Sequence, residues 1–258
     1  MPIWRISTWR ERNRVPLRVL QWPVPGRVWA IDYAEPPRPI DGRFPYLLAV
    51  RDLASGMQLL WRPVEAATSS NTILALESLF ATYGAPLVLK SDNGSHFTAD
   101  MVQELLHSHR VKCLLSPPAW PRYNGAIEAG IGSLKDRTET RAARAGHAGD
   151  WTWDDVAGAC AEATQLARPQ AASPEHLWQH RTTISLTERN AFAACVSARL
   201  ADEKERVSAC EERANEVWSE RAMARMAIRR ALEECGYLHY LRSSILPPIP
   251  RPKAATIT

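Results

Sequence analysis

Two carboxylates in the middle of the chain stand where chemically active side chains are usually held. Asp92 lies in the segment LKSDNGSHF, directly after a short apolar run and before Asn93 and Gly94. A strand that ends in such a turn holds its last side chain at the rim of a sheet. Glu128 lies in PRYNGAIEAGIGSLK, just inside a predicted helix that opens near Asn124, and thirty-five residues separate it from Asp92.

A third acid, Asp32, lies upstream in RVWAIDYAEPP, within or just after another apolar run. Asp32 has apolar and aromatic neighbours, which are unusual around a solvated carboxylate. A buried charge must be paired or bind a cation. Three separated carboxylates suit Mg²⁺, which takes oxygen ligands and keeps several waters. Two such ions about 3.5–4 Å apart can clamp the attacking and leaving oxygens of an in-line phosphoryl displacement. The alternative is three unrelated surface acids, because exposed Asp and Glu are common.

Three segments together resemble the catalytic core of the DDE transposases and retroviral-type integrases, especially bacterial insertion-sequence transposases. These segments are WAIDYAEPP, LKSDNGSHF and PRYNGAIEAGIGSLK. The interval of thirty-five residues is the one for which that family is known. The resemblance covers residues 27–169 and, more loosely, the segment SPEHLWQHRTTISLTER. It implies an RNase H-like α/β fold, with a mixed five-stranded sheet flanked by helices and a helical C-terminal extension.

The resemblance also implies metal-dependent cutting and joining of DNA. Asp32, Asp92 and Glu128 would be the catalytic residues and would hold two Mg²⁺ or Mn²⁺ ions. A water of lowered pKa would hydrolyse a phosphodiester at the element's end, and the freed 3′-hydroxyl would attack a target phosphodiester. DNA, as element ends and as target, is the expected partner, and the chain is expected to act as a homo-oligomer on it.

Six further residues are candidate DNA contacts. Lys135 lies seven positions after Glu128, near the same helix face, where it could meet a phosphate; a solvated side chain is the alternative. Asn93 and His96 flank Asp92 and could orient a metal ligand or touch DNA, whereas a structural turn is the alternative for both. The loop before the helix supplies the remaining candidates, Arg122, Tyr123 and Asn124.

The elements that must position these residues can be read from the apolar pattern. Apolar runs predict five strands, at 27–33, 46–53, 57–62, 87–90 and 111–115. Helices are predicted at 70–83, 98–109 and 124–145, in the order β-β-β-α-β-α-β-α. Three glycines in the last helix are unusual, because each costs about 1 kcal/mol relative to Ala. Gly125 would permit a bend or a close approach of DNA, and Gly130 and Gly132 would permit close helix packing.

Composition divides the chain into a basic, Pro-containing arm (1–26), the catalytic core (27–169) and a helical extension with a tail (170–258). The arm is expected to be irregular, with at most a short helix, because it holds four prolines. Residues 187–235 contain no Gly or Pro and predict a long helical arm or a helical hairpin, followed by an extended tail. Related transposases usually carry a helix-turn-helix module before the core, and 26 residues are too few for one.

Composition also narrows the class of protein. No apolar run approaches the ~20 residues of a membrane span. The N-terminus lacks the apolar stretch of a signal peptide, so a cytoplasmic protein without a membrane partner is expected. Five cysteines, never closely paired, argue against a disulfide framework or a zinc knuckle.

Two alternative functions remain open on the sequence. One is a nuclease of the same fold that hydrolyses DNA without strand transfer. The other is a truncated, non-transposing DNA-binding protein derived from a transposase. Residues 1–31 hold six arginines and one glutamate, whereas the helical extension is close to neutral. Charge of this kind predicts weak, salt-sensitive binding to duplex DNA with little sequence preference.

Overall fold

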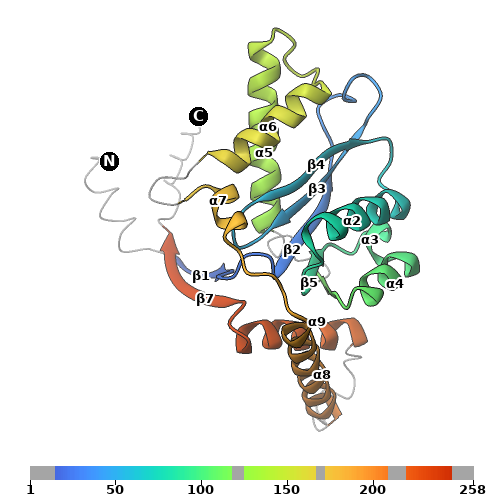
Figure 1. Ribbon diagram of the computed structural model, residues 1–258, viewed down its shortest axis with the longest axis vertical. Coiled ribbons are helices and arrows are strands. Elements are labelled where there is room, and N and C mark those ends of the chain that lie inside the picture. Colours follow the sequence, from blue (N-terminus) through green and yellow to red (C-terminus); the bar gives the residue numbers. More distant parts are fainter. Residues whose placement is uncertain (1–14, 118–124, 167–171, 209–218, 246–258) are drawn as a thin grey trace, which may run out of the picture.

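The computed structural model describes residues 15–117, 125–166, 172–208 and 219–245 (Figure 1). Its centre is a mixed sheet of five strands in the order β4-β3-β2-β5-β6. The strands are β2 (Val28–Ala34), β3 (Tyr46–Asp52), β4 (Gln58–Val64), β5 (Val88–Ser91) and β6 (Lys112–Leu115). β2, β3 and β4 are antiparallel, and β5 and β6 run parallel to β2. The predicted RNase H-like fold class is confirmed.

A buried carboxylate, Asp52, holds the turn between β3 and β4. It accepts hydrogen bonds from the backbone N–H groups of Gly26 and Ser55, at 2.8 Å each, and from Ser55 Oγ at 2.6 Å. Burial raises the pKa of Asp52, although these hydrogen bonds act in the opposite direction. Because Gly26 precedes β2, the same carboxylate joins the beginning of β2 to the end of β3.

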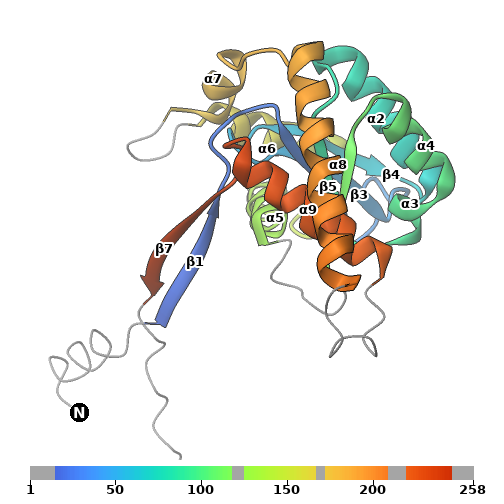
Figure 2. The same cartoon turned by 90° about the horizontal axis from the view of Figure 1, so that it is seen from below.

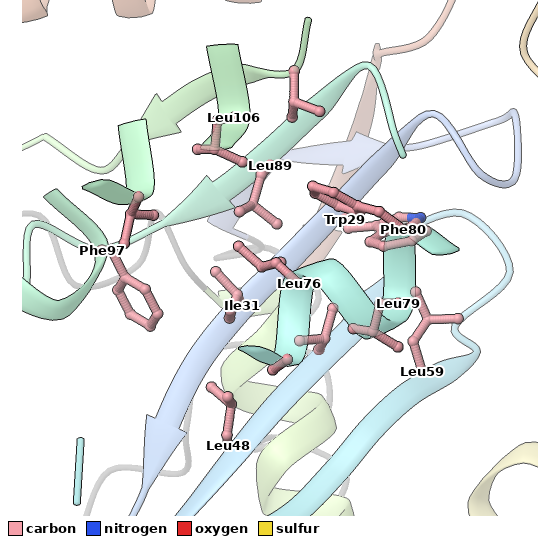
Figure 3. Packing of buried hydrophobic residues seen from close by; sticks show 14 of the residues in the cluster. Trp29, Ile31, Leu48, Leu59, Leu76, Leu79, Phe80, Leu89, Phe97 and Leu106 are labelled. Carbon is pink, nitrogen blue, oxygen red and sulfur yellow. The ribbon is translucent and has the colours of Figure 1, made fainter. Parts of the chain in front are cut away.

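Three helices cover one face of the sheet: α2 (Ser69–Tyr83), α3 (Ser95–Thr98) and α4 (Asp100–Ser108). α2 begins where Thr68 Oγ accepts the N–H of Asn71, and it ends at Gly84, whose φ of 79° suits a residue without a side chain. Successive residues of β2 alternate between the two faces of the sheet. Trp29 therefore points to this face, where it joins Phe80 in the main core cluster (Figure 3).

Two helices cover half of the opposite face: α5 (Gly125–Arg144) and α6 (Trp153–Gln165). Ala30 and Ala34, the intervening residues of β2, pack into this layer with Leu134 of α5. α6 begins with a capping box in which Thr152 and Asp155 each bond the other's backbone N–H. The small side chains of β2 on this face let α5 lie close to the sheet.

The C-terminal part contributes α7 (Pro174–Gln179), α8 (Leu186–Ser208) and α9 (Glu220–Glu234). α8 and α9 pack against each other, in agreement with the hairpin alternative for residues 187–235. Phe192 and Leu232 of this pair meet Val28, Val88 and Leu114 in a third cluster, which covers the β2-β5-β6 side of the sheet. No helix among the described residues is long and apolar enough to cross a membrane.

The expectation of an irregular N-terminal arm is wrong over residues 15–21. These form β1 (Val15–Gln21), which pairs antiparallel with β7 (His239–Ile245) in a two-stranded ribbon that projects from the rest of the molecule (Figure 2). The partner strand lies near the other end of the chain, so no local pattern could reveal the pairing. Residues 239–245 are extended, as predicted for the tail. The three-part division of the chain stays a prediction.

Candidate active site

The sheet register brings two of the three acids to one edge. β2 and β5 are parallel neighbours, and the register pairs Ala30 with Lys90. Two residues further along each strand, Asp32 and Asp92 therefore emerge at the same rim. Glu128 lies in the first turn of α5, the helix that packs over β2 and β3.

The electrostatic environment of Asp32 includes both of the other acids. Burial raises the pKa of Asp32 from its ordinary 3.8 to about 6, and the negative charges of Asp92 and Glu128 add to the rise. The N–H of Tyr33, which donates to Asp32 Oδ1 at 2.8 Å, acts in the opposite direction. Negative charges that raise the pKa of a neighbouring carboxyl mark a place where a cation would be stabilised.

Asp92 is oriented by the turn that follows β5. Its Oδ1 accepts the N–H of Gly94 at 2.9 Å. A Cβ on Gly94 would stand 2.6 Å from the ring of His96, so glycine allows the ring to lie over the turn. Asn93 donates from Nδ2 to the carbonyl oxygen of Ser116 at 2.8 Å, which ties the turn to the end of β6. That contact supports the structural alternative for Asn93.

His96 lies between aromatic rings and Asp92. Its ring centroid is 4.7 Å from that of Tyr33 and 4.2 Å from that of Phe97, both edge to face. Burial lowers the pKa of His96, and the negative charge of Asp92 opposes the change. The ring therefore packs beside the carboxylates as part of the wall of the site.

Lys90 was missed by the sequence analysis. It is a buried residue, 4% exposed, and burial lowers its pKa to about 8 against the opposing influence of Glu128 and Asp32. The available signal was the two-residue period of a strand, which puts Lys90 on the same face as Asp92. A buried ammonium therefore lies close to the carboxylates.

The remaining candidates are Glu128, Lys135 and the three residues that precede α5 in the sequence. Glu128 is exposed, and Lys135 lies half-buried two turns further along α5. Arg122, Tyr123 and Asn124 lie outside the described residues, so their predicted contact with DNA stays a prediction.

The donor set fits a hard divalent cation, since carboxylate oxygens are the ligands that Mg²⁺ and Mn²⁺ prefer. A cation would also relieve the repulsion that raises the pKa of Asp32. Within the part of the chain that the structure describes, no three His, Cys, Asp or Glu side chains already form a compact group able to hold an ion.

The sequence of this segment is similar to known proteins. Residues 23–121 match the integrase core domain family, a range that includes Asp32 and Asp92 and ends before Glu128. An uncharacterized protein of Caenorhabditis elegans is 34% identical over 131 residues, which are 49% of this chain and 10% of that protein. The Pro-Pol polyprotein of feline foamy virus is 32% identical over 105 residues, 41% of this chain and 9% of the polyprotein. The chain thus spans about a tenth of the length of these relatives.

A solved structure shares the fold. The simian T-cell lymphotropic virus intasome, in complex with PP2A regulatory subunit B56 gamma, aligns with a TM-score of 0.55 at 18% identity. The alignment covers 67% of this chain and 63% of the other chain. At that identity the similarity concerns the fold, and the family match adds the type of domain. The chain therefore carries an integrase-type core domain with the RNase H-like fold.

Proposed function

We propose that this chain is the catalytic core of a DNA transposase or integrase, a polynucleotidyl transferase that cuts DNA and joins strands. Asp32, Asp92 and Glu128 are its catalytic residues. The observation that carries the proposal is the register of β2 and β5, which brings Asp32 and Asp92 to one rim of the sheet, together with the negative charge of Glu128 near Asp32. The match of residues 23–121 to the integrase core domain supports the reaction class.

The chain's own residues orient two of the three acids. Asp32 and Asp92 are each oriented by a backbone N–H, from Tyr33 and Gly94. Glu128, in the first turn of α5, would complete the set. When bound, two Mg²⁺ or Mn²⁺ ions would supply charge stabilisation at the phosphodiester and a lowered pKa for the attacking water. Catalysis then consists mostly of positioning and electrostatics.

The proposed partners follow from this reaction. DNA serves both as the end to be cut and as the target to be joined, and Lys135 is a proposed phosphate contact. A homo-oligomer would hold two ends together on one target, and the cytoplasm is the proposed compartment. The chain alone should bind duplex DNA weakly, with little preference between sequences, and lose affinity steeply as salt rises.

A strand-transfer assay tests the proposal. Wild type and Asp150→Asn would be incubated with branched DNA and Mn²⁺ or Mg²⁺; Asp150 is a suitable control because its side chain is exposed and pairs with Arg38. Both proteins should give joined products that EDTA abolishes. Cleavage without joining would instead indicate a nuclease of the same fold. Binding without any cleavage would indicate a DNA-binding protein that has lost catalysis.

A further inference from the structure

Two cysteines that are forty positions apart in the sequence meet where α8 packs against α9 (Figure 2). Cys195 lies in the middle of α8, and Cys235 is the residue at which α9 ends. Both side chains are half-buried and pack against the cluster that covers the β2-β5-β6 side of the sheet. The two thiols form a hydrogen bond with each other. The packing of the two helices thus creates a thiol pair that no sequence spacing indicates.

A carboxylate next to the pair fixes its position. Cys195 Sγ donates to Glu234 Oε2 at 3.4 Å, and the same oxygen forms an ion pair with Arg199 Nε at 3.4 Å. Cys195 and Arg199 belong to α8, whereas Glu234 belongs to α9 and directly precedes Cys235. These contacts therefore hold the end of α9, and Cys235 with it, beside Cys195.

The other cysteines that the structure describes have different surroundings. Cys113 packs against the main core cluster, and Cys160 packs against the cluster that contains α5 and α6. Burial raises the pKa of both thiols, and no second thiol is among the groups that influence either pKa. Within the described residues, Cys195 and Cys235 are therefore the two thiols that are placed to react with each other.

The two thiols differ in how readily they ionise. Burial raises the pKa of Cys195 to about 12, and its hydrogen bonds with Glu234 and Cys235 add to the rise. Burial also raises the pKa of Cys235, but the hydrogen bond with Cys195 acts in the opposite direction. The thiolate is the nucleophile in thiol–disulfide exchange. Cys235 is therefore the thiol expected to react first, and Cys195 the thiol that completes the reaction.

We propose that Cys195 and Cys235 are a redox-active pair that a low-molecular-weight disulfide oxidises to a disulfide bond. The Cys235 thiolate attacks one sulfur of the reagent, forms a mixed disulfide and releases one reagent thiolate. Cys195 then loses its proton and attacks the Cys235 sulfur, which releases the second half of the reagent as a thiol. The chain gives up two electrons and two protons, and the reagent takes them up as it becomes two thiols.

The bond would join the middle of α8 to the end of α9. Cross-links stabilise a fold mainly by restricting the unfolded chain, and the effect grows with the length of the closed loop. Cys235 lies four residues before His239, where β7 begins, so the bond would also fix the base of the β1-β7 ribbon. Oxidation should therefore stabilise the packing of α8 on α9, and reduction should reverse the effect.

Mass spectrometry of tryptic fragments tests the pair. The full chain would be equilibrated with oxidised glutathione, alkylated to block the remaining thiols, and digested without reductant. Cys195, Cys235 and Cys210, which lies outside the described residues, fall in the separate fragments 190–199, 231–242 and 207–213. Fragments 190–199 and 231–242 should be joined, with the loss of two hydrogen atoms. Their absence as a joined pair, or a joined pair that contains 207–213 instead, would overturn the proposal.

Single substitutions test the order of the two attacks. Cys195→Ser should hold Cys235 as a mixed disulfide with glutathione, because the second thiol is missing. Cys235→Ser should leave Cys195 largely unmodified, because the first nucleophile is missing. Cys160→Ala is the matched control and should form the same joined fragments as wild type. Equal glutathione labelling of the two serine variants would overturn the assigned order of attack.

Thermal melting tests whether the bond restrains the fold. Oxidised wild type should melt at least about 5 °C above reduced wild type, and Cys195→Ser should show no such rise. Circular dichroism of the reduced proteins checks that the variants fold. Equal melting temperatures for oxidised and reduced wild type would contradict the stabilising role. Neither DNA nor a divalent metal is present, so the outcome is independent of the proposed function.

Discussion

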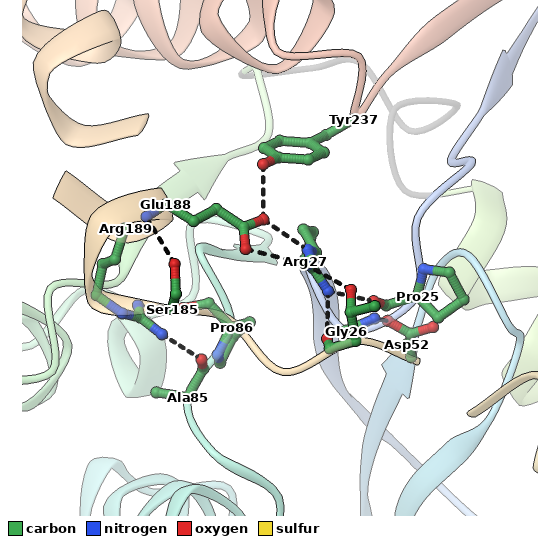
Figure 4. A network of polar contacts seen from close by, with 11 residues as sticks. Pro25, Gly26, Arg27, Asp52, Ala85, Pro86, Ser185, Glu188, Arg189 and Tyr237 are labelled. Carbon is green, nitrogen blue, oxygen red and sulfur yellow. Dashed lines mark hydrogen bonds and ion pairs between the residues drawn. The ribbon is translucent and has the colours of Figure 1, made fainter. Parts of the chain in front are cut away.

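β2 has Arg27 just before its N-terminal end and Asp32 near its C-terminal end, and each of these side chains has charged neighbours. At the first end, the Arg27 guanidinium meets both carboxylate oxygens of Glu188 at 2.9 Å (Figure 4). It also donates to the carbonyl oxygen of Thr182 at 2.6 Å, and Tyr237 donates its hydroxyl to Glu188 at 2.7 Å. At the other end, Asp32 is influenced by the charges of Asp92, Glu128 and Lys90.

The pKa of Glu188 and the pKa of Asp32 are shifted in opposite directions. Burial would raise the pKa of Glu188, but hydrogen bonds from Tyr237 and Arg27 outweigh it, and the pKa is lowered. Burial raises the pKa of Asp32, and neighbouring acids raise it further. The Glu188 cluster is therefore complete in itself and fastens α8 to the core. Around Asp32, by contrast, the negative charges of Asp92 and Glu128 outnumber the positive charge of Lys90.

The largest effect is expected where the surplus charge is removed. Asp92→Asn keeps the shape of the side chain and loses the charge, so Mg²⁺-dependent nicking should fall by at least about 100-fold. Circular dichroism and the melting temperature should stay near wild type, because the amide oxygen can still accept from Gly94. Retained nicking would remove Asp92 from the mechanism.

Lys90→Met tests how much the buried charge of Lys90 destabilises the fold. Lys90 lies on β5, where it pairs with Ala30 of β2. Burial lowers the pKa of Lys90 from 10.5 to about 8, so the folded state disfavours the ammonium below pH 8. The variant should therefore raise the free energy of unfolding at pH 7 by about 3 kcal/mol, since one pH unit corresponds to about 1.4 kcal/mol.

The pH dependence of the stability difference between Lys90→Met and wild type tests whether the charge of Lys90 is the cause. The destabilisation by Lys90 is fully present below pH 8 and fades as pH rises toward 10.5, so the advantage of Lys90→Met should shrink over that interval. Urea unfolding at pH 7 and pH 10 would measure it. An equally large difference at both pH values would show that packing, rather than charge, sets the effect.

Glu188→Gln should act in the opposite direction at the other end of β2. It removes the charge that pairs with Arg27, whose side chain is 5% exposed, and should lower the free energy of unfolding by about 2 kcal/mol. Because the pKa of Glu188 is lowered, its contribution is present above its ordinary pKa of 4.5 and is lost as pH falls through the folded-state value. The variant should approach wild type in urea unfolding under acidic conditions, and a constant difference would argue against the charge.

The smallest effect is expected for a Glu→Gln substitution in an exposed ion pair. Glu65 pairs with Arg43, but both side chains are more than half exposed. Glu65→Gln should change the free energy of unfolding by less than about 1 kcal/mol, because water screens such pairs. A loss as large as that of Glu188→Gln would mean that burial does not distinguish the two pairs.

Much of the fold could be predicted because its signals are local. The apolar run before Asp92 and the turn after it indicated a strand end, and β5 ends at Ser91. A helix was predicted over residues 70–83, and α2 spans Ser69–Tyr83. The predicted helix at 124–145 corresponds to α5, which carries Glu128 in its first turn. The role of the three acids stays a proposal, since the assays above have to test it.

The sequence by itself determined the five strands of the sheet, the helices of the core and the position of each acid, because apolar periodicity and turn residues act over a few neighbours. Only the tertiary structure decided that β1 pairs with β7, that Lys90 is buried beside the carboxylates, and that Arg51 lies on Gly130. Each of these joins residues far apart in the chain. Such contacts depend on how the layers pack, and no local period encodes them.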